Sequence, residues 1–162
     1  MTEDNPTVSR QTPPKLMLMV FNPIFGLLLR SPAHRLVDEA FMILHLTGRK
    51  TGKRYDLVVG RHDLDGVLTV MTSAPWRLNT RDGAAVAVTL DGRTRHGQGH
   101  LVEDVDQVTD AYAAEIERYG WKGAQRSLGL KLGAGRAPTR DELSTAVVRD
   151  GLSLIRITDL EP

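Results

Sequence analysis

Five short segments joined by turns constrain the fold of this chain more than any other feature of its sequence. Each has the length of a β-strand, and they span residues 41–46, 55–59, 67–71, 84–90 and 93–102, of which the first four are rich in apolar residues. Asp91-Gly92, between the last two, is a typical signal for a tight hairpin. Strands that hairpins connect pair antiparallel, so the pattern predicts an antiparallel sheet that curls into a small barrel.

The spacing of apolar residues changes after the fifth segment, where helices are expected. Over residues 105–119 apolar side chains recur at steps of three and four, which predicts a helix that ends at Gly120. A second helix is expected to begin at Thr139, because Thr139 and Glu142 have the spacing of a capping box. A final strand is expected over residues 152–157, so the predicted fold class is α+β.

Length and composition predict one domain and exclude several classes of function. A polar tail at 1–14 is expected to be disordered, and one domain is expected over 15–162. The chain has no cysteine, which excludes a disulfide framework and a thiolate nucleophile and fits a reducing cytoplasm. The net charge of +1 argues against a nucleic-acid partner, since such binding needs a concentrated basic surface.

The segment from Leu16 to Leu29 is apolar and allows two interpretations. It is shorter than the roughly 20 residues that a transmembrane helix needs. It is either a helix that caps the core or contacts a second copy of the chain, or a helix that lies on a membrane surface between Lys15 and Arg30. The expected location is the cytoplasm, with peripheral contact to the inner face of the membrane under the second interpretation, and a homodimer is expected because small barrels of this kind often pair through the sheet.

The connection between the first two predicted strands is unusually basic. It reads Thr47-Gly48-Arg49-Lys50-Thr51-Gly52-Lys53-Arg54, with four cations in six positions and two glycines. Glycines let backbone N–H groups converge in a tight loop, and fixed positive charge favours an anion there. The loop lacks the spacing of a P-loop, and a solvated hairpin turn is the alternative interpretation. If a phosphate binds, Arg49 and Lys50 are the first candidates to contact it.

A second cluster, Ala74-Pro75-Trp76-Arg77-Leu78-Asn79, combines a turn with an aromatic ring and a cation. Together the two clusters predict a planar, phosphate-bearing ligand between neighbouring strands. No metal is expected, because His96 and His100 would lie roughly 13 Å apart along one strand. The sequence has no nucleophile elbow or convincing acid pair for hydrolysis, which indicates that a cofactor supplies the chemistry.

The run Leu46-Thr47-Gly48-Arg49-Lys50-Thr51-Gly52, the strand at 67–71, and Pro75-Trp76-x-x-Asn79 resemble the deazaflavin-dependent nitroreductase and quinone reductase family. The resemblance is strongest over residues 41–103. It implies a split β-barrel, related to flavin-dependent pyridoxamine-phosphate oxidases, with an N-terminal helix and C-terminal helices. It also implies that the chain binds coenzyme F-420, an 8-hydroxy-5-deazaflavin whose tail carries a phosphate and several glutamates.

The resemblance assigns cofactor-binding roles to residues of three segments, whereas it assigns no catalytic residue. The phosphate and the acidic tail are expected at Gly48, Arg49, Lys50, Thr51 and Gly52. The ring is expected beside the backbone of Leu57, Val58 and Val59, with Thr72 and Ser73 near its reactive part. Trp76, Arg77 and Asn79 are expected to close the groove. The loop before Trp76 is shorter than in the family and lacks the family's lysine.

The implied activity is hydride transfer from the reduced deazaflavin to a small apolar electrophile. A quinone, an activated alkene and a nitro compound are all acceptors of this class. Two alternatives stay open, both on the same barrel. One is an FMN-dependent reductase, and the other is a protein that binds a lipid or another apolar ligand without turnover.

Overall fold

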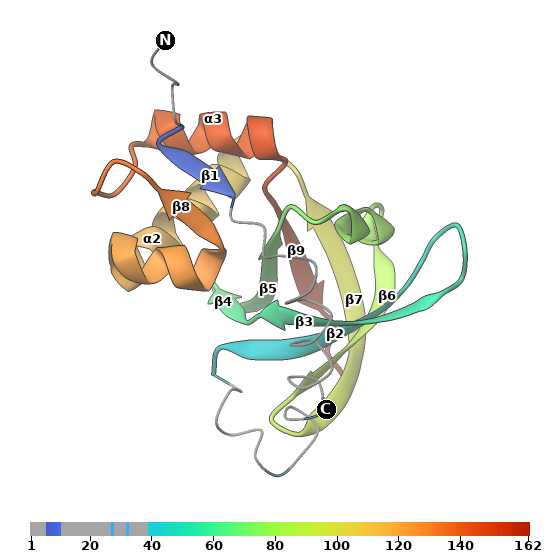
Figure 1. Cartoon of the computed structure of the whole chain (residues 1–162). Coiled ribbons are helices and arrows are strands. Elements are labelled where there is room, and N and C mark those ends of the chain that lie inside the picture. Colours follow the sequence, from blue (N-terminus) through green and yellow to red (C-terminus); the bar gives the residue numbers. More distant parts are fainter. Residues whose placement is uncertain (1–5, 11–26, 28–31, 33–38) are drawn as a thin grey trace. The chain divides into compact units, whose positions relative to one another are not determined.

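The computed structural model describes residues 6–10, 27, 32 and 39–162 (Figure 1). The apolar helix expected between Leu16 and Leu29 therefore lies outside the described residues, except at Leu27. The chain divides into two compact units. The helical unit comprises Met1–Thr12 and Val102–Ser153, and the barrel unit comprises Pro13–Leu101 and Leu154–Pro162. The expected single domain over 15–162 stays a prediction, because compactness alone does not decide whether the units fold independently.

The barrel unit contains one seven-stranded sheet with the order β3-β2-β6-β7-β9-β5-β4 (Figure 1). Its strands are β2 (Phe41–Thr47), β3 (Arg54–Gly60), β4 (His62–Leu64), β5 (Val67–Thr72), β6 (Ala84–Leu90), β7 (Arg93–Val102) and β9 (Ser153–Thr158). The hairpins β2–β3, β4–β5 and β6–β7 are antiparallel, and so is the long-range pair β2–β6. The expected strand segments are thus confirmed, and β4 is an additional strand.

The path of the chain closes this sheet on itself. Strands β3 and β4 follow one another with only Arg61 between them, yet they lie at opposite ends of the strand order. The sheet must therefore curl until its two ends meet, and β3 also contacts β5. This confirms the predicted α+β fold with an antiparallel sheet that curls into a barrel.

Alternating residues of the strands fill the interior of the barrel. Met42, Leu44 and Leu46 of β2 are buried against residues of β6 and β9. Burying a leucine side chain of this kind contributes about 2 kcal/mol. Strand β7 instead places Gly97 where β9 comes close, because a Cβ atom there would lie 2.6 Å from the backbone oxygen of Thr158. Gly97 therefore permits the close backbone approach that the core requires.

In the helical unit, α2 (Val105–Leu128) and α3 (Arg140–Asp150) begin at side-chain caps. Asp104 accepts a hydrogen bond from the backbone N–H of Gln107 at the start of α2. Gly120 has φ +71° and ψ 158°, which interrupts α2 at the position where the sequence predicts its end. The remainder of α2 follows this kink. No helix among the described residues is long and apolar enough to cross a membrane.

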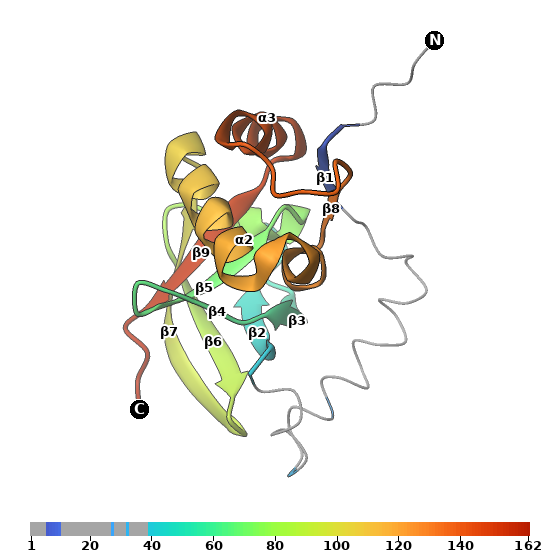
Figure 2. The same cartoon turned by 90° about the vertical axis from the view of Figure 1, so that its left-hand side faces the viewer.

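The predicted capping box of α3 is confirmed. Thr139 Oγ1 accepts from the backbone N–H of Glu142, and Glu142 accepts from the backbone N–H of Thr139 at 2.7 Å. Strand β1 (Val8–Arg10) pairs with β8 (Leu130–Leu132) in the same unit (Figure 2). Val8–Arg10 thus form a strand in a segment for which disorder is expected, because pairing with β8 satisfies their backbone groups. Residues 1–5 and 11–14 of that tail lie outside the described residues.

Candidate functional site

The basic loop, defined as residues 48–53, connects β2 to β3 in a tight turn. The backbone N–H of Gly48 donates to the Lys53 oxygen at 2.8 Å, and that of Gly52 donates to the Gly48 oxygen at 2.9 Å. Gly52 has φ +68°, a conformation that side chains disfavour. A Cβ atom on Gly48 would lie 2.9 Å from Thr51 Oγ1. The backbone conformation of the loop therefore favours glycine at position 52, and a side chain at position 48 would have to displace that of Thr51.

The turn that contains Trp76 forms a 3₁₀-helix, η2 (Pro75–Thr80), and contacts the basic loop. The Asn79 side chain joins the two: its Oδ1 accepts from the Arg49 backbone N–H at 3.0 Å. Its Nδ2 donates to the Trp76 backbone oxygen at 2.9 Å. The Arg49 guanidinium also donates to the Leu78 backbone oxygen at 3.3 Å. The structure therefore brings together two clusters that lie about 30 residues apart in the sequence.

The cations of the basic loop differ in what they contact. The Arg49 guanidinium lies 3.9 Å from an Asp82 carboxylate oxygen, besides its bond to η2, so part of its charge is neutralised. The Lys53 ammonium lies 5.7 Å from the centre of the Tyr55 ring. Lys50 is exposed, and its ammonium has no hydrogen-bonding or ion-pairing partner in the part of the chain that the structure describes. Arg49 thus holds the loop in place, while Lys50 and Lys53 carry accessible positive charge.

The other predicted residues before and within η2 shape the turn. The Arg77 guanidinium donates to the backbone oxygens of Ser73 at 2.9 Å and Ala74 at 3.2 Å. Thr72 Oγ1 accepts from the backbone N–H of Ala74 at 3.1 Å. Trp76 is half-buried and packs against the barrel core. These contacts give the side chains of the Trp76 cluster a structural role in the turn. They also fix the position of its backbone relative to the basic loop.

The two predicted residues of β3 lie on opposite faces of the sheet. Val59 is buried in the barrel core. Val58 pairs with Ile43 and lies on the same face as Asp56, two residues earlier along the strand. Only Val58 therefore lies on the face that carries polar side chains.

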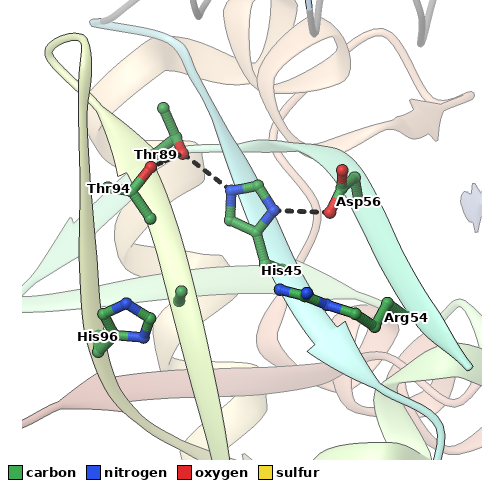
Figure 3. Close-up of a pocket in the computed structure, with 7 residues that line it drawn as sticks. His45, Arg54, Asp56, Thr89, Thr94 and His96 are labelled. Carbon is green, nitrogen blue, oxygen red and sulfur yellow. Dashed lines mark hydrogen bonds and ion pairs between the residues drawn. The ribbon is translucent and has the colours of Figure 1, made fainter. Parts of the chain in front are cut away.

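That face holds a cavity of about 560 Å³, which we call the polar pocket (Figure 3). It is lined by His45, Arg54, Asp56, Ala87, Thr89, Thr94 and His96. These residues come from four adjacent strands, and the strand registers bring them together. His45 is paired with Asp56 on β3 and with Ala87 on β6, and Ala87 is paired with His96 on β7.

Hydrogen bonds link four side chains of the polar pocket in series. His45 Nδ1 lies 2.7 Å from Asp56 Oδ1, and His45 Nε2 lies 2.8 Å from Thr89 Oγ1. Thr89 Oγ1 in turn lies 2.7 Å from Thr94 Oγ1 (Figure 3). Thr89 is 4% exposed, whereas Thr94 is exposed to solvent. The series therefore runs from the exposed Asp56 through His45 and the buried Thr89 to the exposed Thr94.

Sequence reasoning missed the polar pocket, although part of the signal was present. A hairpin that pairs Thr47 with Arg54 also pairs His45 with Asp56, and the Asp91-Gly92 turn pairs Thr89 with Thr94. The pairing of β2 with β6 has no local signal. Across the described ranges, no group of three or more His, Asp or Glu residues is placed to hold a metal ion.

Comparison with known proteins leaves the family unassigned. No family model matches the chain, and no curated protein matches it. One similar solved structure is described as a domain-swapped dimer, with 14% identity over 90% of this chain and 100% of the other, and a TM-score of 0.45. Another is a conserved hypothetical protein, Rv2991, from Mycobacterium tuberculosis, with 15% identity over 79% of each chain and the same TM-score. The resemblance to the deazaflavin-dependent reductases stays a prediction.

Proposed function

We propose that this chain is an oxidoreductase that binds a deazaflavin coenzyme of the F-420 type and reduces a small apolar electrophile. A quinone, an activated alkene or a nitro compound would be the acceptor. The observation that carries the proposal is the bridge formed by Asn79, which holds the basic loop against η2 through hydrogen bonds of 3.0 and 2.9 Å. A junction of this kind would hold the positive charge of the basic loop close to the aromatic residue of η2, as a planar ligand with an anionic tail requires.

The basic loop suits the phosphate and carboxylates of such a coenzyme. Lys50 and Lys53 are exposed, and the hydrogen bonds of Arg49 to η2 fix the loop that carries them. Fixed cations attract a polyanionic tail without first having to be ordered, so less conformational entropy is lost on binding. Glu and phosphate oxygens accept charge-assisted hydrogen bonds from ammonium groups.

The residues of η2 would orient the coenzyme rather than react. The coenzyme, when bound, would supply the hydride. Trp76 packs on the barrel core and can form a fixed wall, while the Thr72 hydroxyl keeps its proton available for donation because its oxygen accepts from Ala74. Orientation by such groups is a recognised source of rate enhancement.

The proposal includes a cellular setting. A chain without cysteine fits the reducing cytoplasm, and we propose that the protein acts there as a homodimer. The segment from Leu16 to Leu29, on which the membrane-contact alternative depends, lies outside the described residues.

Isothermal titration calorimetry with the oxidised deazaflavin coenzyme and with FMN tests the cofactor. We expect deazaflavin binding, weakened about tenfold in Lys50→Ala/Lys53→Ala because each exposed charge contributes up to about 1 kcal/mol. Added salt is expected to weaken wild-type binding more than that of the variant, because screening acts on the charges that the variant lacks. The matched control, Lys122→Ala/Lys131→Ala, removes two exposed lysines of the helical unit and is expected to bind like the wild type.

Other outcomes would replace the proposal. Binding of FMN but not of the deazaflavin would identify an FMN-dependent reductase. Binding of neither would contradict redox catalysis and favour the protein that holds a lipid or another apolar ligand. Given deazaflavin binding, oxidation of the reduced coenzyme by a quinone, absent without protein, would establish the activity.

A further inference from the structure

In the hydrogen-bond series of the polar pocket, Asp56 determines which group donates and which accepts at each contact. A carboxylate only accepts hydrogen bonds, so the 2.7 Å contact to Asp56 Oδ1 places a proton on His45 Nδ1. In the neutral imidazole, Nε2 is then an acceptor, and the Thr89 hydroxyl must donate to it across 2.8 Å. The only hydroxyl hydrogen of Thr89 is already donated to His45, so in the 2.7 Å contact Thr94 is the donor and Thr89 the acceptor. Thr94 is left with acceptor capacity alone.

Protonation of His45 exchanges the donor and acceptor roles of the His45–Thr89 and Thr89–Thr94 hydrogen bonds. When both ring nitrogens carry protons, Nε2 donates to Thr89, and Thr89 can then donate to Thr94. The proton of the exposed Thr94 hydroxyl is released for a new acceptor in the pocket. The same residue thus accepts from a ligand in one protonation state of His45 and donates to a ligand in the other.

The remaining polar groups of the pocket favour a negatively charged ligand. The charged and titratable groups that line it with His45 are Arg54 and Asp56 on β3 and His96 on β7, while β6 contributes only Ala87 and Thr89. Asp56 is bonded to His45. Arg54 and His96 are exposed, and neither side chain has a hydrogen-bonding partner within the described residues. In Figure 3, Arg54 reaches from β3 across β2 beside His45.

We propose that the polar pocket binds a small oxyanion, a carboxylate or a phosphate, and that binding takes up a proton at His45. In the protonated state the anion meets the Arg54 guanidinium, the His96 ring N–H and the Thr94 hydroxyl, all of them donors. In the neutral state Thr94 offers lone pairs that repel it. Anion binding and proton binding at His45 are therefore linked, and each strengthens the other.

This site is separate from the one proposed for the deazaflavin. None of its lining residues belongs to the basic loop or to η2. Arg54 directly follows the basic loop, so the Lys50→Ala/Lys53→Ala variant, which leaves every lining residue of the pocket intact, distinguishes loss of deazaflavin binding from loss of anion binding.

Calorimetric titration with sulfate and with acetate, at constant ionic strength set by chloride, tests the proposal. Sulfate stands in for phosphate because it does not titrate near neutral pH, and acetate represents a carboxylate. Repeating each titration at several pH values in buffers of different ionisation enthalpy counts the protons taken up. We expect binding with uptake of up to one proton per anion, and preference for sulfate or acetate would distinguish the two sources.

Three variants test which residues are responsible for anion binding and for proton uptake. Arg54→Gln is expected to weaken binding about tenfold, the loss typical of one charge-assisted hydrogen bond. Thr94→Val removes an exposed hydroxyl and is expected to bind the anion without proton uptake. His45→Gln is also expected to abolish uptake, and Thr94→Val gives an independent result should His45→Gln fail to fold. Arg93→Gln, which changes an exposed arginine on the other face of β7, is the matched control.

The outcomes that overturn the proposal are equally specific. No anion binding in the wild type, or equal binding by the wild type and Arg54→Gln, would exclude the site. Proton uptake that survives in both Thr94→Val and His45→Gln but disappears in His96→Gln would assign the coupling to His96 and refute the role of His45. Binding without any proton uptake would refute the coupling.

Discussion

Several charged side chains of the helical unit pair with one another, whereas some cations of the barrel unit line a loop and a pocket without such partners. Arg136 and Glu142 form an ion pair of 2.9 Å, and Arg149 lies 2.6 Å from Asp150. These pairs stabilise helix ends and short connections. These four charged side chains therefore have a structural role in the unit.

The barrel unit has unpaired cations at two places, the basic loop and the polar pocket. Lys50 of the basic loop and Arg54 and His96 of the polar pocket make no hydrogen bond or ion pair with another side chain in the described part of the chain. Cations that a fold does not use for its own stability are the ones available to a ligand. In a chain whose net charge is only +1, unpaired cations that gather at one loop or pocket indicate candidate sites better than total charge does.

The largest expected effect tests whether stability of the barrel unit comes from its core. Leu44→Ala should destabilise the protein by about 3 kcal/mol, since the leucine is fully buried and a cavity would remain. Thr47→Ala, at an exposed position of the same strand, should change stability by no more than about 0.5 kcal/mol. Urea unfolding measures both, and equal effects would show that the core does not dominate.

The next effect tests the close approach of β7 and β9. Gly97→Ala would set a Cβ atom 2.6 Å from the backbone oxygen of Thr158, which cannot move as a flexible side chain would. We expect a loss of about 1–3 kcal/mol, typical of overpacking. Gln98→Ala, one residue along and exposed, is the control in thermal unfolding. A Gly97→Ala protein as stable as this control would contradict the close approach.

A smaller effect is expected where Asn79 joins the basic loop to η2. Asn79→Leu should cost about 1–2 kcal/mol, because it removes one acceptor and one donor. Asn79→Asp keeps the acceptor for the Arg49 N–H and should lose about half as much. Chemical denaturation gives both values. The deazaflavin titration should then show that Asn79→Leu binds more weakly than the wild type, because the basic loop is no longer held against η2.

The smallest effect concerns paired charge in the helical unit. The hydrogen bond from Arg136, followed by that from the Thr139 backbone, lowers the pKa of Glu142 from 4.5 to about 2. Because the folded-state pKa is depressed, this stabilisation is present above the unfolded-state value and is lost as pH falls through the folded-state value. We expect stability to fall between pH 4.5 and about pH 2 in the wild type.

Thermal melts followed by far-UV circular dichroism across that range measure this effect. Glu142→Gln should lack the corresponding part of the pH dependence, while Asp141→Asn, which neutralises a charge in the same helical turn, should retain it. Identical curves for Glu142→Gln and the wild type would show that the pair does not contribute.

The sequence predicted those features that depend on neighbouring residues. The capping box of Thr139 and Glu142, the break at Gly120 and the strand segments of the barrel all follow from short-range spacing. The basic loop and the turn at Trp76 were recognisable for the same reason, because each is one contiguous run. Their contact through Asn79 depends on the curl of the sheet, and no local pattern encodes it.

Features that depend on pairing between distant segments were missed. Strand β1 exists because Val8 pairs with Leu132, more than a hundred residues away, and three residues have no recognisable periodicity. The polar pocket requires β2 to pair with β6, which sets His45 beside Thr89. Single side chains on four strands leave no motif in the sequence, so only the fold brings them together.

The position of β9 has a consequence for the synthesis of this protein. In the sheet β9 lies between β7 and β5, although along the chain it follows both helices. Until Ser153–Thr158 leave the ribosome, the sheet consists of two pieces, β3-β2-β6-β7 and β5-β4. While the helical segment is translated, β7 and β5 each have one edge without its strand partner β9. Release of β9 completes the sheet, because this strand pairs with both edges.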